Sequence, residues 1–231
     1  MITIVAHRGA PRHARENTVK SFLAAVSLGA DMVELDVRKT GDGTLVVFHD
    51  PWLSRKTRRP LVAGLTYREL NRRAGKRKFH VPTVEEAFAA LAGKTMLNIE
   101  LKEPGYEADV VKLAQRILTD GRYILTSFHP AIIAALKSFD SRLTTGLIIA
   151  KVKNLHAALK TGAEVLAPEY GLFASQRKFF ADATGRGKKI AVWTVDSVSR
   201  LSSLIVDPLV DAVITNRPDL AGDLRRRLCG G

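Results

Sequence analysis

The side chains in this sequence that could do chemistry are two histidines, three carboxylates and two cations beside short apolar runs. They are His7, His49, Glu34, Asp36, Glu100, Arg8 and Lys102. Carboxylates are hard oxygen ligands for divalent cations, histidines transfer protons near neutral pH, and Arg and Lys bind phosphate oxygens. Together these residue types predict a metal-assisted site that cleaves phosphodiesters.

The spacing of the carboxylates favours a metal site. Glu34 and Asp36 are two residues apart, so on a strand they point to the same face. Two unpaired carboxylates inside a barrel would be costly, and a divalent cation would remove that cost, with Glu100 as a third oxygen ligand. An all-oxygen set predicts one Mg²⁺ or Ca²⁺ ion, with Mn²⁺ as a further candidate, in preference to Zn²⁺. The alternative is ordinary ion pairing of these carboxylates with Arg38 or Lys102.

The histidines and cations suggest how a phosphodiester would be handled. His7 and His49 could form an acid–base pair in which one activates the attacking oxygen and the other protonates the leaving alkoxide. The sequence leaves open which histidine takes which role. Arg8 would bind phosphoryl oxygens bidentately and Lys102 as a point charge. Trp193, at the end of a predicted strand, either belongs to the core or walls an alcohol-binding pocket.

The elements that must position these residues alternate between short apolar runs and helix-period segments. Strands are predicted at 3–6, 31–37, 44–48, 95–101, 123–126, 143–149, 164–167, 189–194 and 210–214. Helices are predicted at 17–28, after a cap at Thr83, and at 106–119, 130–138, 151–161, 174–186, 197–206 and 217–228. With 44–48 as a hairpin partner of the second strand, the remaining βα units predict a closed (β/α)₈ TIM barrel. The rival is an open doubly wound sheet, but no G-x-G-x-x-G motif follows a predicted strand.

The barrel prediction agrees with where the candidate residues fall. Barrels carry catalytic side chains at the C-terminal ends of their strands. His7 ends the first predicted strand, Glu34 and Asp36 lie late in the second, and Glu100 ends the third. We expect residues 1–231 to form a single barrel domain, with 51–80 as a short basic cap insertion.

The charge of the chain is strongly positive. It has 36 Lys and Arg against 23 Asp and Glu, a formal net charge of +13. Ten of the basic residues and one acid, Glu69, fall between Pro51 and His80, which reads as a solvated basic loop or as a collar that draws anions toward His49. Anionic lipid, nucleic acid and phosphorylated small molecules are all attracted by such a charge. Since no nucleic-acid-binding motif is found and aromatic residues are 6% of the chain, no specific nucleic acid is expected.

Three further features bear on the location of the protein. No apolar run approaches the ~20 residues that span a bilayer. The N-terminal run MITIVAHRGA reads as a first strand and not as a signal peptide, because no basic leader precedes it. The single cysteine, Cys229, allows no internal disulfide and fits a reducing compartment. The expected location is cytoplasmic.

The candidate residues lie in motifs that resemble those of the glycerophosphodiester phosphodiesterase family. The motifs are His7-Arg8-Gly9, Glu16-Asn17-Thr18, Gly29-Ala30-Asp31-Met32-Val33-Glu34-Leu35-Asp36-Val37, Thr40-Gly41-Asp42-Gly43, Val47-Phe48-His49-Asp50, Val81-Pro82-Thr83-Val84-Glu85-Glu86 and Asn98-Ile99-Glu100-Leu101-Lys102. Weaker similarities follow at Thr126-Ser127-Phe128, Val192-Trp193-Thr194-Val195-Asp196 and Ile214-Thr215-Asn216-Arg217-Pro218.

The resemblance implies a fold, a reaction and a set of roles. It implies a TIM barrel with a small cap and hydrolysis of glycerophosphodiesters to glycerol 3-phosphate and an alcohol. It also implies a divalent metal held by Glu34, Asp36 and Glu100, and catalytic histidines at His7 and His49. A small-molecule glycerophosphodiester is therefore the expected substrate.

The sequence departs from the family pattern at two positions, and two other functions remain open. Arg15 stands where the family usually has Pro, and Asp196 stands where Asn is common after Trp-Thr-Val.

Within the enzyme class, the alternative function is a lysophospholipase D-like activity on membrane lipids, with the basic segment in peripheral contact with an anionic membrane. Outside it, the alternative is a non-enzymatic barrel that binds anions or nucleic acid.

Overall fold

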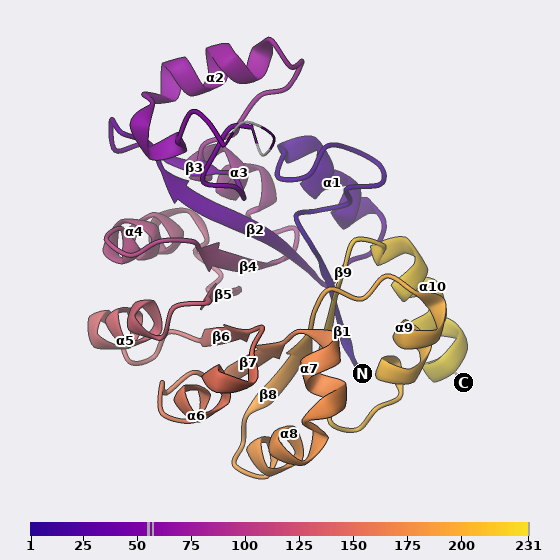
Figure 1. The fold of residues 1–231 in the computed structure, drawn as a ribbon. Helices are drawn as coiled ribbons and strands as arrows, with labels where there is room; N and C mark the ends of the chain where they lie inside the picture. Colours follow the sequence, from indigo (N-terminus) through magenta and orange to yellow (C-terminus); the bar gives the residue numbers. More distant parts are fainter. Residues whose placement is uncertain (55, 57, 231) are drawn as a thin grey trace.

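A closed parallel sheet positions the candidate residues. The computed structural model describes residues 1–54, 56 and 58–230, and the strands within them are β1 Thr3–Ala6, β2 Met32–Lys39, β3 Leu45–Val47, β4 Met96–Leu101, β5 Tyr123–Ser127, β6 Thr145–Ile149, β7 Val165–Pro168, β8 Lys189–Val192 and β9 Ala212–Thr215. The order is β1-β9-β8-β7-β6-β5-β4-β2, and parallel pairing of β1 with β2 closes the ring (Figure 1). β3 joins antiparallel to β2. The predicted TIM barrel and its hairpin are confirmed.

Helices surround the barrel (Figure 1). In the described residues they are α1 Val19–Ser27, α2 Tyr67–Gly75, α3 Val84–Leu91, α4 Glu107–Ile117, α5 Pro130–Phe139, α6 Leu155–Ala158, α7 Tyr170–Ser175, α8 Arg177–Thr184, α9 Val198–Ile205 and α10 Pro218–Cys229, with 3₁₀ turns η1 Val62–Gly64 and η2 Val152–Asn154. The predicted cap at Thr83 is confirmed as a capping box with Glu86. None of the helices in this part of the chain combines the length and apolar character that crossing a membrane requires.

Three predicted helices differ from those observed. The helix predicted at 151–161 is too long, since η2 and the short α6 cover only part of it. The helix predicted at 174–186 is wrong as a single element, because Gln176 leaves helical geometry between α7 and α8 (φ −121°, ψ 32°). The helix predicted at 17–28 begins two residues later, because Asn17 has a left-handed backbone (φ 56°).

Alternation along β2 decides which side chains point into the barrel. Val33, Leu35 and Val37 pack in the outer layer between sheet and helices. Met32 belongs to the apolar cluster inside the barrel. Because successive side chains of a strand face opposite ways, the carboxylates at the next two inward positions lie above this cluster, toward the C-terminal rim.

Residues 51–80, called the cap below, lie beside β3 and include η1 and α2 (Figure 1). The interpretation of this segment as a loop is partly wrong, because α2 begins with a capping box of Thr66 and Glu69. The apolar side of α2 packs in a small cluster that includes a residue of β3. The described Lys and Arg of the cap are all exposed; Arg55, also counted in the sequence, lies outside the described residues.

Candidate active site

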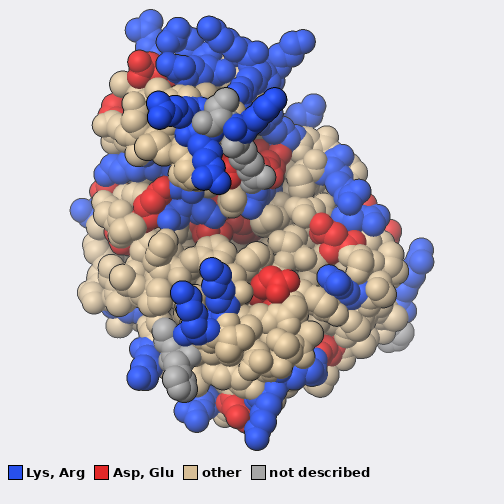
Figure 2. Space-filling view, viewed as in Figure 1, with Lys and Arg blue, Asp and Glu red and all other residues tan. Residues whose placement is uncertain are grey.

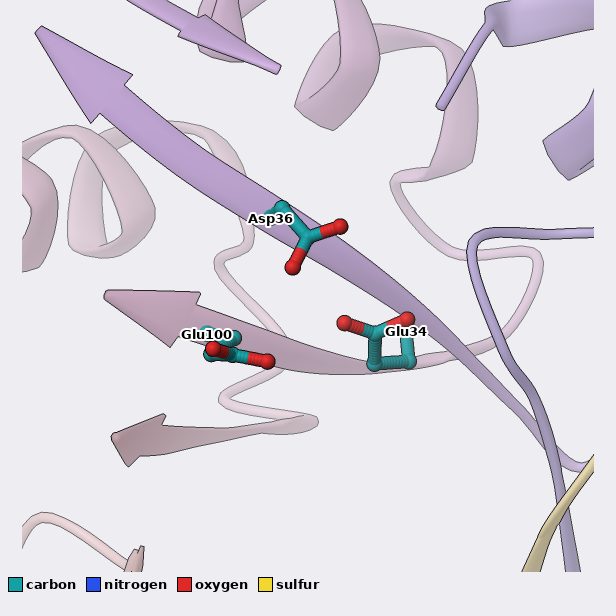
Figure 3. Close-up of side chains that lie close together, drawn as sticks. All are labelled: Glu34, Asp36 and Glu100. Carbon is teal, nitrogen blue, oxygen red and sulfur yellow. The ribbon is translucent and has the colours of Figure 1, made fainter. Parts of the chain in front are cut away.

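Three carboxylates from the neighbouring strands β2 and β4 converge (Figure 3). β2 carries Glu34 and Asp36, and β4 carries Glu100. Asp36 and Glu100 are register partners across the parallel ladder, and Glu34 is one inward position lower on β2. One oxygen of each carboxylate lies within 4.8 Å of the others. The structure therefore brings together the three residues that the sequence predicts as metal ligands.

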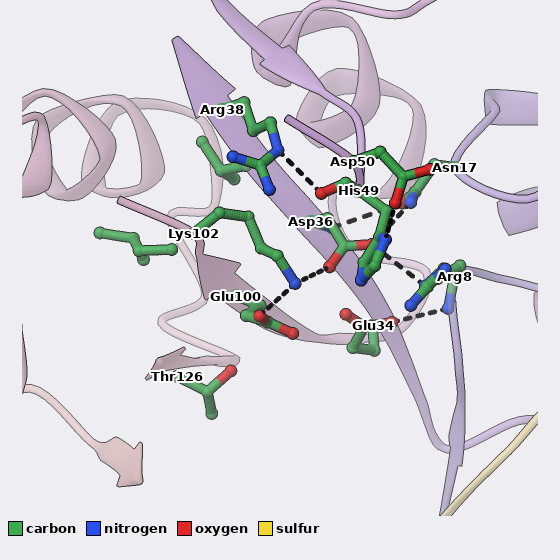
Figure 4. Close-up of polar contacts among 12 residues, drawn as sticks. Arg8, Asn17, Glu34, Asp36, Arg38, His49, Asp50, Glu100, Lys102 and Thr126 are labelled. Atoms are coloured by element: carbon green, nitrogen blue, oxygen red, sulfur yellow. Dashed lines mark hydrogen bonds and ion pairs between the residues drawn. The ribbon is translucent and has the colours of Figure 1, made fainter. Parts of the chain in front are cut away.

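Two cations contact these carboxylates (Figure 4). Lys102 Nζ lies 3.1 Å from Asp36 Oδ1 and 2.5 Å from Glu100 Oε1. Arg8 Nε lies 3.2 Å from Asp36 Oδ2. Each cation thus borders the acidic cluster from a loop that follows a barrel strand, β4 for Lys102 and β1 for Arg8.

Glu34 retains an uncompensated oxygen. Its Oε2 accepts a hydrogen bond from the backbone N–H of Arg8 (2.7 Å), while its buried Oε1 has no hydrogen-bond partner among the described residues. Burial, and then the negative charges of Asp36 and Glu100, raise the pKa of Glu34 well above its ordinary value. A divalent cation would give this oxygen a partner and offset the repulsion, so the donor set fits a hard cation.

The other two carboxylates respond differently to the same surroundings. Burial raises the pKa of Asp36, but Lys102 and Arg8 outweigh it and hold that pKa well below its ordinary value. Burial and the charge of Asp36 raise the pKa of Glu100 to about 7, although Lys102 is adjacent. Three carboxylates beside two cations leave the cluster short of positive charge when all are ionised, a condition that favours binding of a divalent ion.

The two histidines are each anchored through Nδ1. His7 follows β1, and its Nδ1 lies 2.8 Å from Asn216 Oδ1. His49 follows β3, and its Nδ1 lies 2.8 Å from Asp50 Oδ1. Burial lowers the pKa of both imidazoles. Both rings are therefore oriented by a neighbouring oxygen.

Arg38 does not pair with the three carboxylates. It forms an ion pair with Glu103, and its Nε donates a hydrogen bond of 2.8 Å to the backbone carbonyl of His49 (Figure 4). The sequence offered Lys102 and Arg38 as ion-pair partners of the three carboxylates. The pairing with Lys102 is confirmed, whereas the pairing with Arg38 is wrong, because Arg38 links β2 to the segment that carries His49.

A cavity of about 70 Å³ opens among the candidate residues. The predicted residues in its wall are His7, Arg8, Glu34, His49, Glu100, Lys102 and Trp193. Trp193 is fixed by a hydrogen bond of 2.7 Å from its Nε1 to the carbonyl of Ala167. It meets Phe128 edge to face, with ring centroids 5.5 Å apart. Polar and cationic groups thus occupy one side of the cavity, and two aromatic rings contribute to another.

Three residues of the site were given no site role from sequence. Asn17 holds Asp36 through two hydrogen bonds. Asn17 Nδ2 donates to Asp36 Oδ2 (2.7 Å), and Asn17 Oδ1 accepts from the backbone N–H of Asp36 (3.3 Å). Phe128 forms part of the cavity wall, and Asn216 anchors His7. Their motifs were visible in the sequence, but their partners are distant along the chain and meet only in the closed barrel.

A second cavity, of about 260 Å³, also has His49 in its wall and lies between the cap and the loop after β1. The loop contributes Arg15 and Glu16, and the cap contributes Arg77 and Phe79. The guanidinium carbon of Arg15 lies 3.5 Å from the ring centroid of Phe79. Arg15 therefore connects the loop to the cap.

Known proteins share both the sequence pattern and the fold. The model of the glycerophosphoryl diester phosphodiesterase family matches residues 7–220. A glycerophosphodiester phosphodiesterase from Caldanaerobacter subterraneus is 32% identical over 240 residues, which cover 97% of this chain and 98% of that protein. The fold is similar to that of a glycerophosphodiester phosphodiesterase from Thermotoga maritima (TM-score 0.84, 25% identity, 97% of this chain and 99% of that one). It is also similar to an Oleispira antarctica phosphodiesterase in complex with the product sn-glycerol-3-phosphate (TM-score 0.84, 24% identity, 96% of each chain).

Proposed function

The chain belongs to the glycerophosphodiester phosphodiesterase family and is an enzyme of that activity, and we propose that it uses a divalent cation to release glycerol 3-phosphate and an alcohol. The observation that carries this proposal is the convergence of three carboxylate oxygens within 4.8 Å beside two anchored imidazoles. The sn-glycerol-3-phosphate bound to the Oleispira antarctica phosphodiesterase supports the proposed product.

The carboxylates of Glu34, Asp36 and Glu100 would hold the cation. Their all-oxygen chemistry favours Mg²⁺ or Ca²⁺, with Mn²⁺ as a further candidate. When bound, the ion supplies positive charge that stabilises the negative charge developing on the phosphoryl oxygens. The Oε1 of Glu34 supports this assignment, since it is a buried carboxylate oxygen of this cluster with no hydrogen-bond partner among the described residues.

The protein's own groups bind the phosphodiester and move protons. Arg8 and Lys102 border the cavity and bind the phosphoryl oxygens. A hydroxyl oxygen attacks phosphorus, and the bond from phosphorus to the alcohol oxygen breaks. Attack by water gives glycerol 3-phosphate directly, whereas attack by the substrate's own glycerol hydroxyl gives a cyclic phosphate that a water molecule then opens to glycerol 3-phosphate. His7 and His49 divide the proton transfers, one accepting the proton of the attacking hydroxyl and the other protonating the departing alkoxide. Trp193 contributes the apolar wall against which the substrate's carbon atoms pack.

The test is a hydrolysis assay on glycerophosphocholine and related diesters, with glycerol 3-phosphate release as the readout. Release should require Mg²⁺, Ca²⁺ or Mn²⁺ and stop with a chelator. H7A and H49A should each lower turnover by roughly 10²-fold or more, the usual contribution of a general acid or base. H129A, which changes an exposed histidine, is the matched control and should keep wild-type turnover. Chelator-resistant hydrolysis would contradict metal dependence, and near-normal turnover of H7A or H49A would remove that histidine from the mechanism.

The cap favours a second candidate, a lysophospholipase D-like activity on lipids at an anionic membrane. Figure 2 shows Lys and Arg gathered over the cap, at the top of the view. The exposed basic residues there are Lys56, Arg58, Arg59, Arg68, Arg72, Arg73, Lys76, Arg77 and Lys78. Each Lys or Arg near an anionic surface contributes about 1 kcal/mol of attraction, which falls off within a Debye length. Since the cap borders the cavity beside His49, docking it on lipid headgroups would bring the site to the membrane.

Co-sedimentation with vesicles tests this candidate. The wild type should sediment with phosphatidylserine-containing vesicles at low salt, but not with phosphatidylcholine vesicles, and binding should fall as salt rises. The variant R72Q/R73Q/K76Q should lose most of the binding. A matched triple variant near α8, K178Q/R186Q/K189Q, removes the same charge from exposed positions away from the cap and should bind far better. Equal loss in both variants, or no wild-type binding, would rule out cap-directed docking.

A further inference from the structure

Asp196 and Asn216 form a chain of contacts that ends on His7. Asp196 follows β8, Asn216 follows β9 and His7 follows β1, so the three residues come from neighbouring strands of the barrel. Asp196 Oδ1 accepts hydrogen bonds from the Asn216 backbone N–H (2.8 Å) and the Thr215 hydroxyl (3.0 Å). Asp196 Oδ2 accepts from Asn216 Nδ2 (2.7 Å). Asn216 Oδ1 then lies 2.8 Å from His7 Nδ1.

We infer that Asp196 is a positioning residue, which fixes the amide of Asn216 and thereby sets which ring nitrogen of His7 carries the permanent proton. The inference rests on the proposed role of His7. Asp196 is absent from the described wall of the cavity that contains His7, so it acts through Asn216 and not on the substrate.

The direction of each hydrogen bond follows from donor and acceptor chemistry. An ionised carboxylate has no proton and can only accept, so the amide NH₂ of Asn216 is the group that faces Asp196. The amide oxygen must then face His7. Because an amide oxygen also only accepts, His7 Nδ1 must carry a hydrogen. Nε2 is therefore the nitrogen of His7 that gains and loses a proton, whether the imidazole acts as acid or as base.

The surroundings hold this arrangement in register. Thr215 is fully buried, and the backbone N–H of Val195 donates to the carbonyl of Ile214 (3.0 Å), which joins the segment after β8 to β9. The two oxygens of Asp196 receive three hydrogen bonds, so rotation of its carboxylate would break contacts to both backbone and side chain. The amide of Asn216 consequently has one satisfied orientation and one in which two acceptors face each other.

The variant D196N would remove this selectivity. The amide oxygen that it places at position 196 could keep the Asn216 backbone N–H, but the new NH₂ would face the NH₂ of Asn216. Rotation of the Asn216 amide would relieve that conflict and turn its NH₂ toward His7 Nδ1. Neutral His7 would then have to accept at Nδ1 and carry its hydrogen on Nε2, which takes the proton-accepting lone pair away from the cavity.

The experiment is ¹⁵N NMR of the histidine side chains together with steady-state kinetics. The His7 signals are assigned by their loss in H7Q. We expect wild-type His7 in its neutral form to carry its hydrogen on Nδ1, and D196N to shift the population toward the Nε2–H tautomer. D196N should lower kcat by roughly 10-fold or more, a sizeable part of a general acid–base contribution, with KM within about twofold.

The matched control is D211N. Asp211 precedes β9, and its Oδ2 accepts the backbone N–H of Ile190 (2.8 Å) at the opposite end of these strands. D211N therefore removes a carboxylate acceptor that links β8 to the start of β9 without touching Asn216. It should change neither the His7 tautomer nor kcat.

Three results would overturn the inference. The first is an Nε2–H tautomer of neutral His7 in the wild type, which would overturn the inference even if D196N failed to fold. An unchanged tautomer in folded D196N, or a shifted tautomer with wild-type kcat, would remove the positioning role. Since the tautomer is read without substrate, absence of glycerophosphodiester hydrolysis in the wild type would count against the proposed function and leave the NMR result standing.

Discussion

Glu34 shows how one buried oxygen can indicate a ligand. Its Oε1 has no hydrogen-bond partner in the described part of the chain, and two more carboxylates lie close by. A buried charged oxygen without a partner costs free energy, so either the carboxyl group is protonated or another positive group is present. The cationic side chains of Arg8 and Lys102 contact Asp36, and Lys102 also contacts Glu100, which leaves this oxygen to be satisfied from the cavity side.

The variant E34Q tests that reasoning on the metal itself. We expect Mn²⁺ affinity, measured by isothermal titration calorimetry, to fall at least tenfold, because the amide lacks the charge that a hard cation prefers. In chelator, E34Q should unfold at a Tm roughly 2–4 °C higher than the wild type, the shift that ~1 kcal/mol produces in a chain of this size. The control E85Q removes an exposed ion-pair partner of Arg116 and should leave Mn²⁺ affinity unchanged. Unaltered Mn²⁺ affinity in E34Q would show that Glu34 is not a ligand.

Single residues were predictable from sequence where one motif contains both the group and its context. Glu34 and Asp36 share a face of one strand, and that spacing alone predicts their convergence. Asn216 and Phe128 could not be given roles, because each acts on a residue that is distant along the chain. The rim of a barrel collects such residues only once the ring closes.

Among the elements, the strands were more predictable than the helix boundaries. β2 and β4 alternate apolar and polar side chains, because their outer faces meet helices and their inner faces reach the site. The break between α7 and α8 and the shortness of α6 follow from local backbone geometry at Gln176 and around the η2 turn, which apolar periodicity does not report. The capping box of Thr66 and Glu69 is a sequence signal for the start of α2. The many basic residues of the cap favoured the interpretation of a loop, and α2 was therefore not predicted.

An ion pair that joins three elements makes a prediction about acid stability. Glu164, just before β7, pairs with Lys137 of α5 and accepts the backbone N–H of Thr145 in β6 (2.8 Å). Burial raises the pKa of Glu164, but Lys137 and the Thr145 N–H outweigh it, so the folded-state pKa lies below the ordinary value of 4.5. A carboxyl group whose pKa is lowered by folding stabilises the protein fully above its unfolded pKa and loses that contribution as pH falls through the folded value.

The measurement is Tm against pH for the wild type, E164Q and K137M. Above pH ~5 the wild type should have the higher Tm, and the gap to E164Q should narrow as the pH falls below 4.5, because protonation of Glu164 then removes the same charge. K137M should reduce this pH dependence, since it removes the partner. A wild-type to E164Q gap that stays constant from neutral to acid pH would mean that the ionised pair does not stabilise the fold.

For the whole molecule, the sequence predicts the architecture better than it predicts the cap. Repeated βα units specify a barrel because each strand needs a helix to cover its outer face and a neighbour on each side. The cap occurs once and belongs to no repeated βα unit, and its own apolar cluster is small. Its internal structure is therefore harder to predict from sequence. Its charge and its position after His49 were evident from sequence, and the structure adds that the basic side chains gather over the cap (Figure 2).

The stacking of Arg15 on Phe79 has a consequence for anyone who would exchange caps between members of this family. The loop that carries Arg15 also supplies Glu16, whose Oε2 lies 3.3 Å from Arg8 Nη1, and so leads to the side of the site that we propose binds phosphate. A grafted cap without an aromatic ring at the position of Phe79 would leave Arg15 with no ring to stack on. The loop and the cap are therefore structurally coupled, and a chimera should take both of them from the same parent protein.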